Sequence, residues 1–264
     1  MNPKDQNPAD KSQAQILVVT SGKGGVGKTS LSVNVATELA SRGLRIMLVD
    51  ADLGLANAHI LMGIKPTSSL TDYLENRAGL TDILSTGPSG LKLISGGQGV
   101  KEMANIDAEG RTRILDAIYD LRAYCDLVII DTGAGVSKTV TDFVAIADQT
   151  LVVTNANFAA IANAYGIIKV MVLEGYSRPM HLLVNRVRST EEANQVFQKL
   201  KECTEKFLSC NLNYLGLVPE DVRVNVSVQK RTPFTQAYPD TIASTYLKKI
   251  ANGIEGLLQK GART

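Results

Sequence analysis

The chain has 264 residues, of which 44% are hydrophobic and 20% charged, and its formal net charge is +2 at pH 7. These values are typical of a globular protein with a substantial core, and a net charge this small does not indicate nucleic acid or an acidic substrate as the ligand. The three cysteines, Cys125, Cys203 and Cys210, lack Cys-x-x-Cys spacing, which argues against a disulfide framework or a zinc ribbon and fits a reducing cytosol.

The N-terminal residues are polar. Residues 1–14 include Pro3 and Pro8, and we expect them to form a flexible lead-in. They contain no apolar segment of the secretory type, and no run elsewhere is long enough to span a bilayer. We therefore expect a cytoplasmic protein in which residues 15–264 form one domain.

The first predicted strand leads directly into a glycine-rich loop. Ile16–Val19 is a continuous apolar run, residues 22–29 fit the pattern G-x-x-x-x-G-K-[ST], and apolar residues at helical spacing follow from Leu31. In this context the glycines let successive backbone N–H groups point at one spot, where phosphate oxygens bind beside the helix N-terminus. A glycine-rich turn without chemical meaning is the alternative, but the flanking elements favour a nucleotide. We expect Lys28 to reach the β- and γ-phosphates and the Thr29 hydroxyl to ligate Mg²⁺.

Strand and helix patterns alternate along the rest of the chain. The predicted strands cover residues 44–49, 91–94, 127–130, 151–153, 181–184 and 214–218. The predicted helices are short pieces around 55–61, 70–76 and 80–85, followed by 107–122, 159–173, 191–207 and 241–258. Continuously apolar strands indicate a sheet covered on both faces, and the helices between them are long enough for right-handed crossovers. We therefore predict an α/β fold with a mostly parallel, doubly wound sheet.

Polar residues follow several of these strands, at the edge where such sheets bind ligands. Asp131 ends a buried strand before a glycine turn, as a Walker-B aspartate near Mg²⁺ does, although a turn or helix cap also uses aspartate there. Asp50 and Asp52 end another strand, where one can face the metal and the other the γ-phosphate, or both can be solvated. Asn185 ends a third, where it can contact the base or cap the next turn.

With Lys23 included, the loop K-G-G-V-G-K-T resembles the deviant Walker A motif of the MinD/ParA family of P-loop ATPases, and the resemblance extends from about residue 14 to 258. In that family the first lysine crosses to the partner's nucleotide, so that two protomers sandwich two ATP molecules. The resemblance implies that Lys23 acts in trans and Lys28 in cis, and that Asp52 orients the attacking water. It implies Mg²⁺ held near Thr29, Asp50 and Asp131.

The resemblance also implies how the nucleotide is bound. Asn185 matches the adenine-contacting position, and Pro219–Glu220 lies on the other side of the base; the Asn-Lys-x-Asp element of guanine-specific GTPases is absent here. The residues expected to contact the nucleotide are Gly22, Gly24, Gly25, Val26, Gly27, Lys28, Thr29, Ser30, Asn185 and Pro219. The implied activity is weak ATP hydrolysis with Mg²⁺ that depends on an ATP-induced homodimer, as in a switch.

Within the family, the chain resembles the flagellar-number regulator branch, FlhG, also called FleN or YlxH. The resemblance lies in residues 50–57, 96–99, 131–135 and 214–239. That branch limits flagellar number or placement, and its implied partners are the GTPase FlhF and a flagellar transcription regulator. This chain departs from the branch in two places. Only Asp5-Gln6 remains of an N-terminal element that stimulates the GTPase. Residues 155–158 read Asn-Ala-Asn-Phe where relatives carry P-E-P-T, and Asn163 replaces a later aspartate.

The final predicted helix has two interpretations. Its apolar residues recur at helical spacing, at Ile242, Tyr246, Ile250, Ile254 and Leu257. Basic residues accompany them, at Lys248, Lys249, Lys260 and Arg263. Such a helix either packs on the sheet or contacts anionic lipid at the inner membrane, as in MinD; Gly253 and Gly256 weaken its apolar face, and we favour packing.

Two other functions stay open. A ParA-type DNA partition ATPase would need a basic surface for phosphate contacts, which the near-neutral charge disfavours. An iron–sulfur carrier or nitrogenase-type reductase would need paired cysteines. His59 and His181 stand alone and far apart in the sequence, so we expect them to be packed or surface residues rather than ligands.

Overall fold

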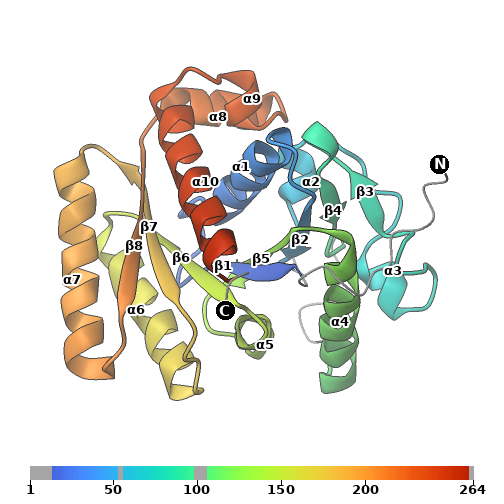
Figure 1. Cartoon of the computed structure of the whole chain (residues 1–264), viewed down its shortest axis with the longest axis horizontal. Helices are drawn as coiled ribbons and strands as arrows, with labels where there is room; N and C mark the ends of the chain where they lie inside the picture. Colours follow the sequence, from blue (N-terminus) through green and yellow to red (C-terminus); the bar gives the residue numbers. More distant parts are fainter. Residues whose placement is uncertain (1–13, 53–55, 98–105, 262–264) are drawn as a thin grey trace.

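The computed structural model describes residues 14–52, 56–97 and 106–261 (Figure 1). The predicted lead-in, with its Asp5-Gln6 element, therefore lies outside the described residues except for Ala14. In the described part, one sheet has the strand order β3-β4-β2-β5-β1-β6-β7-β8. The strands are β1 (Gln15–Ser21), β2 (Ile46–Ala51), β3 (Leu84–Thr86), β4 (Lys92–Ile94), β5 (Leu127–Ala134), β6 (Gln149–Thr154), β7 (Met180–Val187) and β8 (Leu212–Pro219).

Helices connect these strands. They are α1 (Lys28–Ser41), α2 (Ala58–Leu61), α3 (Leu70–Leu74), α4 (Ala108–Leu121), α5 (Lys138–Ala145), α6 (Phe158–Leu173), α7 (Thr190–Leu208), α8 (Val222–Gln229), α9 (Phe234–Ala237) and α10 (Ile242–Gly261). Neighbouring strands run parallel except for β3, which pairs antiparallel with β4 at the edge. The predicted mostly parallel, doubly wound α/β fold is confirmed.

Alternation along the central strands builds two cores. In β1, Ile16 and Val18 belong to the core that α4–α7 cover, whereas Leu17 and Val19 belong to the core under α1 and α10. Successive side chains of a strand point to opposite faces, so a strand of continuous apolar residues requires cover on both sides. The apolar strands therefore fix the sheet as the central layer, and the loops at its edges become the places for polar chemistry.

One predicted element is wrong. The sequence pattern predicts a helical piece at residues 80–85, but residues 80–83 form turns and β3 begins at Leu84. Ile83 is fully buried, and Leu84 pairs with Ile94 of β4. Pairing along the sheet edge thus outweighs a short helical pattern that spans fewer than two turns, because so short a helix has little stability of its own.

The final helix packs into the fold. α10 lies against α1 and β8 (Figure 1), and its buried stripe consists of Ala243, Leu247, Ile250, Ala251 and Ile254. This confirms the packing interpretation, although the stripe is rotated from the predicted one, since Ile242 is 56% exposed. In the part of the chain that the structure describes, no helix is both long and apolar enough to cross a membrane.

Candidate functional site

The loop between β1 and α1 is closely packed and depends on glycine at two places. Gly27 caps the N-terminus of α1 with φ 93°, in the left-handed region, and a Cβ there would lie 2.3 Å from Nδ2 of Asn185. A Cβ on Gly22 would lie 1.9 Å from the backbone oxygen of Asn163 in α6. Only glycine fits these approaches. No side chain caps α1 at Gly27, so the N-terminal N–H groups of α1 are available to an anion such as phosphate.

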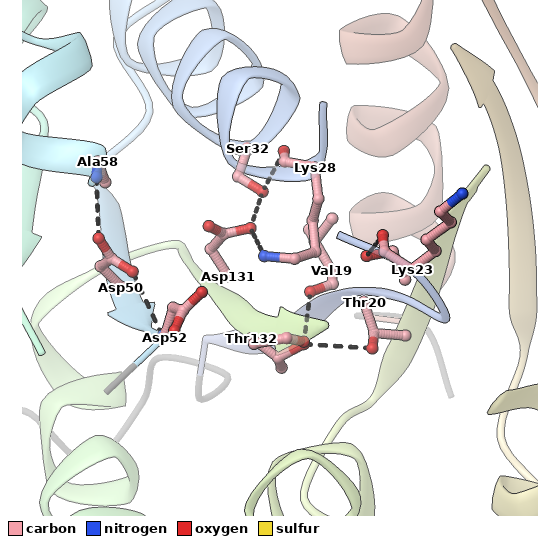
Figure 2. A network of polar contacts seen from close by, with 12 residues as sticks. Val19, Thr20, Lys23, Lys28, Ser32, Asp50, Asp52, Ala58, Asp131 and Thr132 are labelled. Atoms are coloured by element: carbon pink, nitrogen blue, oxygen red, sulfur yellow. Dashed lines mark hydrogen bonds and ion pairs between the residues drawn. The ribbon is translucent and has the colours of Figure 1, made fainter. Parts of the chain in front are cut away.

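Lys28 lies under this loop in a buried polar cluster with Asp131 and Ser32 (Figure 2). Its Nζ donates a hydrogen bond of 2.9 Å to Oδ1 of Asp131, and the Ser32 hydroxyl donates one of 2.8 Å to the same oxygen. The side chains of Lys28 and Asp131 are only 7% and 0% exposed. Within the described residues, Oδ2 of Asp131 is buried without a hydrogen-bond partner. A buried acceptor of this kind suits a cation or its bound water.

Asp50 lies beside Asp131 on the adjacent strand of the sheet. The two residues are paired in the register of β2 and β5, and both are fully buried. The Asp50 carboxylate accepts hydrogen bonds from the backbone N–H groups of Ala58, at 2.8 Å, and Asp52, at 3.3 Å. Burial, and then the negative charge of Asp131, raise the pKa of Asp50 to about 7. The site therefore concentrates negative charge that a divalent cation would neutralise.

A pocket opens on the other side of the loop. Its lining includes Gly27, Ser30, Asn185, Pro219, Val224 and Asn225. Asn185, buried at the end of β7, donates from Nδ2 to the backbone oxygen of Val26 at 2.8 Å. The next residue, Arg186, donates to the backbone oxygen of Gly25 at 3.2 Å. Asn185 therefore bonds to the phosphate loop itself, and the pocket beside it can receive a nucleobase.

The comparisons with known proteins agree with this geometry. The family model for the CobQ/CobB/MinD/ParA nucleotide binding domain matches residues 17–234. The chain belongs to this family. The antiactivator FleN of Pseudomonas aeruginosa is 36% identical over 241 residues, which make up 91% of this chain and 86% of that protein. The flagellum site-determining protein YlxH of Helicobacter pylori is 30% identical over 255 residues, or 96% of this chain and 86% of that protein.

The solved structures show the same fold. The septum site-determining protein MinD of Pyrococcus horikoshii, in complex with Mg-ADP, superposes with a TM-score of 0.79 at 21% identity, covering 92% of this chain and 97% of that one. The MinD/ParA resemblance drawn from the loop is confirmed. As a member of the MinD/ParA family, the chain is a P-loop ATPase that uses ATP and Mg²⁺.

The ATPase fold brings most of the expected residues to the carboxyl ends of the strands. The loop and the first turn of α1 hold Gly22, Gly24, Gly25, Val26, Gly27, Lys28, Thr29 and Ser30. Asp50, Asp52 and Asp131 lie on one side of the loop, and Asn185 and Pro219 lie on the other. Lys23 is exposed, and Figure 2 shows its side chain directed away from the Lys28–Asp131 pair.

Thr29 and the aspartates do not by themselves form a complete metal-binding site. Among the described residues, no group of three or more His, Cys, Asp and Glu side chains is arranged to hold a metal ion. Mg²⁺ at nucleotide sites is bound by one or two protein ligands, several waters and the phosphates. A hydroxyl at the start of α1 and a buried, unsatisfied carboxylate oxygen fit that mode of binding.

Sequence reasoning missed Ser32 and Arg186. Ser32 lies four residues after Lys28, on the same face of α1, so its position on the helix was a usable signal. Arg186 gave no such signal, because its contact with Gly25 depends on the positive φ of 54° that turns the backbone at the end of β7. The two histidines are packed, as expected: each is 6% exposed, and burial lowers the pKa of both.

Proposed function

We propose that this ATPase is a dimerisation switch that regulates the number or placement of flagella. The observation that carries the switch is the contrast between its two loop lysines. Lys28 is buried on Asp131, whereas Lys23 is exposed and directed away from it. Lys23 is close to Lys28 in the sequence, but its ammonium group faces outward. It is therefore placed to contact the nucleotide of another subunit.

The other residues have the following proposed roles. Backbone N–H groups of the loop and Lys28 bind the phosphates, and Thr29 and Asp131 hold Mg²⁺, with Asp50 beside them. Bound Mg²⁺ would neutralise charge on the phosphate oxygens. Asp52 orients the attacking water. Its carboxylate lies at the edge of the site, where a Cβ on Gly133 would be 4.0 Å from Oδ1. Asn185 and Pro219 bind adenine in the pocket.

Lys23 of one subunit would stabilise the charge that develops on the phosphates of the other. Hydrolysis would then wait for dimerisation, and the loss of ATP would release the dimer. ATP shifts this equilibrium because the dimeric state binds it more tightly.

Solution mass tests the switch. Static light scattering is measured on the wild type, Asp52→Ala and Lys23→Ala with Mg²⁺ and either ADP or ATP. We expect monomers with ADP, a stable dimer of Asp52→Ala with ATP, and little or no dimer of Lys23→Ala. If the mass of Asp52→Ala does not depend on the nucleotide, the switch is refuted.

The flagellar role is supported by the relatives. Two proteins that align with nearly the whole of this chain are described as an antiactivator and as a flagellum site-determining protein. We propose a flagellar transcription regulator and the GTPase FlhF as partners, with action in the cytoplasm. Peripheral membrane contact stays a prediction. The apolar stripe of α10 is buried in the core, so this stripe is not exposed to lipid.

Electron microscopy of a deletion strain tests this role. Flagella per cell and their positions are counted in the encoding organism with the gene deleted, restored, or restored as Lys28→Ala. We expect extra or misplaced flagella in the deletion and in the Lys28→Ala strain, and normal flagellation on restoration of the wild type. Unchanged flagella after deletion would contradict the proposal.

A further inference from the structure

Two large apolar side chains are exposed on segments that contact the loop of Lys23. Phe158 is 76% exposed at the first position of α6, and Val136 is 51% exposed in the turn after β5. Among the described residues, neither of the two buried clusters includes either side chain. A single exposed apolar residue needs no explanation, but two that flank one functional loop indicate an interaction surface.

Hydrogen bonds tie the Val136 turn to the loop. The N–H of Gly135, the residue before Val136, donates to the backbone oxygen of Ser21 at 2.9 Å. The Ser21 hydroxyl in turn donates to the backbone oxygen of Lys23 at 3.2 Å. Val136 is therefore fixed beside the segment that carries Lys23.

α6 lies against the same segment. Gly22 packs directly on the backbone of Asn163, which is one and a half helical turns after Phe158. The Asn157 side chain accepts a hydrogen bond from the N–H of Ala159, and this cap fixes the start of α6. The Phe158 ring is held outward there, and Lys199 of α7 lies over it, 5.8 Å from the ring centroid. We call Lys23, Val136 and Phe158 together the loop rim.

We propose that Phe158 and Val136 are the apolar anchors of the ATP-bound homodimer, covered by a second copy of this chain; this inference rests on the proposed dimerisation switch. For Lys23 to reach a nucleotide in another subunit, the surface around it must come into contact with that subunit. In a two-fold dimer each copy presents the same patch, so both loop rims are buried at once. Exposed aromatic residues at such a position contribute a large share of the binding free energy when the interface excludes water.

The sequence around Phe158 agrees with an apolar contact. Residues 155–158 read Asn-Ala-Asn-Phe, and Asn163 follows within α6, so this stretch is uncharged. An interface formed here cannot depend on carboxylates from this segment. The ring of Phe158 and the side chain of Val136 supply buried area in their place.

The test measures dimer dissociation constants by light scattering across a concentration series, in the Asp52→Ala background with Mg²⁺ and ATP. The added substitutions are Phe158→Ser, Val136→Ser and Phe158→Leu. The matched control is Phe207→Ser, because Phe207 is 64% exposed on α7 and also lies under a lysine, with Nζ of Lys206 5.3 Å from its ring centroid. ADP affinity is measured on each protein to assess the isolated nucleotide site.

We expect Phe158→Ser and Val136→Ser each to weaken the dimer about tenfold or more, with unchanged ADP affinity. Phe158→Leu and Phe207→Ser should dimerise as the parent does. If Phe158→Ser and Val136→Ser both dimerise as strongly as the parent, the inference is overturned, whereas the proposed switch is unaffected. An equal loss of ADP affinity in Phe158→Ser would overturn it too, since the residue would then support the nucleotide site. A parent that stays monomeric with ATP would refute the proposed switch, and the inference with it.

Discussion

Lys28 and Asp131 form a buried ion pair, with Nζ 2.9 Å from Oδ1, between the start of α1 and the middle of β5. Ser32 completes the cluster by donating to the same carboxylate oxygen. The pair joins the phosphate loop to the central strand of the sheet, so the residue expected to bind phosphate also contributes to the stability of the fold. This dual role leads to the first prediction.

Lys28→Met should destabilise the protein by about 3 to 5 kcal/mol, because the buried carboxylate of Asp131 would lose its compensating charge. Adding Asp131→Asn should recover much of that loss, since no uncompensated charge then remains. Urea unfolding of the two single variants and the double variant measures the coupling. Additive losses would show that the pair has no special energetic role.

The raised pKa of Asp50 predicts a pH dependence of stability. The ordinary value is 3.8 and the folded value about 7, so the folded protein binds more protons than the unfolded chain between these values. Stability should therefore fall as pH rises through this window, with a slope of up to about 1.4 kcal/mol per pH unit from this group. Asp50→Asn should flatten that slope and be more stable than the wild type at pH 8.

Urea unfolding in EDTA, at several values from pH 5 to 8, measures the effect without bound divalent cations. The comparison of wild type with Asp50→Asn removes the contribution of other groups. An identical slope in both proteins would mean that Asp50 ionises normally in the fold.

Gly27→Ala should destabilise the loop for two separable reasons. The left-handed φ of 93° costs a residue with a Cβ on the order of 1 to 2 kcal/mol, and the new Cβ would also clash with Asn185. The double variant Gly27→Ala/Asn185→Ala should regain the stability lost to the clash, but not the stability lost to the unfavourable backbone conformation. Thermal unfolding measures stability, and ADP binding shows whether the loop keeps its shape. A double variant no more stable than Gly27→Ala would argue against the close contact.

Leu247 and Ile242 test the packing of α10. Leu247 is fully buried, so Leu247→Ala should cost about 2 to 5 kcal/mol. Ile242 is more than half exposed, so Ile242→Ala should change stability by less than about 0.5 kcal/mol. Urea unfolding of both variants gives the comparison. Equal effects would mean that α10 is rotated from the orientation described.

The sequence predicted the fold because local pattern and global architecture agree. β1, β2, β5, β6 and β7 are apolar on both faces, and a strand of that kind has no stable place outside the middle of a covered sheet. The local pattern at Leu84 predicts a helix, whereas the edge strand forms there because Leu84 pairs with a residue of β4 ten positions along the chain.

The candidate site was predictable as far as the ends of the strands, since motif and register bring Asp50 and Asp131 side by side. The side-chain network was not. The bond from Asn185 to Val26 and the outward orientation of Lys23 depend on backbone conformations in two loops, which residue types alone do not determine. The same limit applies to α10, where the predicted apolar stripe includes the buried Ile250 and Ile254 but also the exposed Ile242.

The most direct test of the account is a mixing experiment on ATP hydrolysis. Lys23→Ala and Asp52→Ala should each be inactive alone, because every site then lacks either the partner's lysine or its own aspartate. In a mixed dimer, the site of the Lys23→Ala subunit keeps its Asp52 and receives Lys23 from its partner. An equal mixture should therefore be clearly more active than either variant alone, up to about a quarter of wild-type activity, the value reached if half of the dimers are mixed and each has one complete site. A mixture no more active than its components would contradict the action of Lys23 across the dimer.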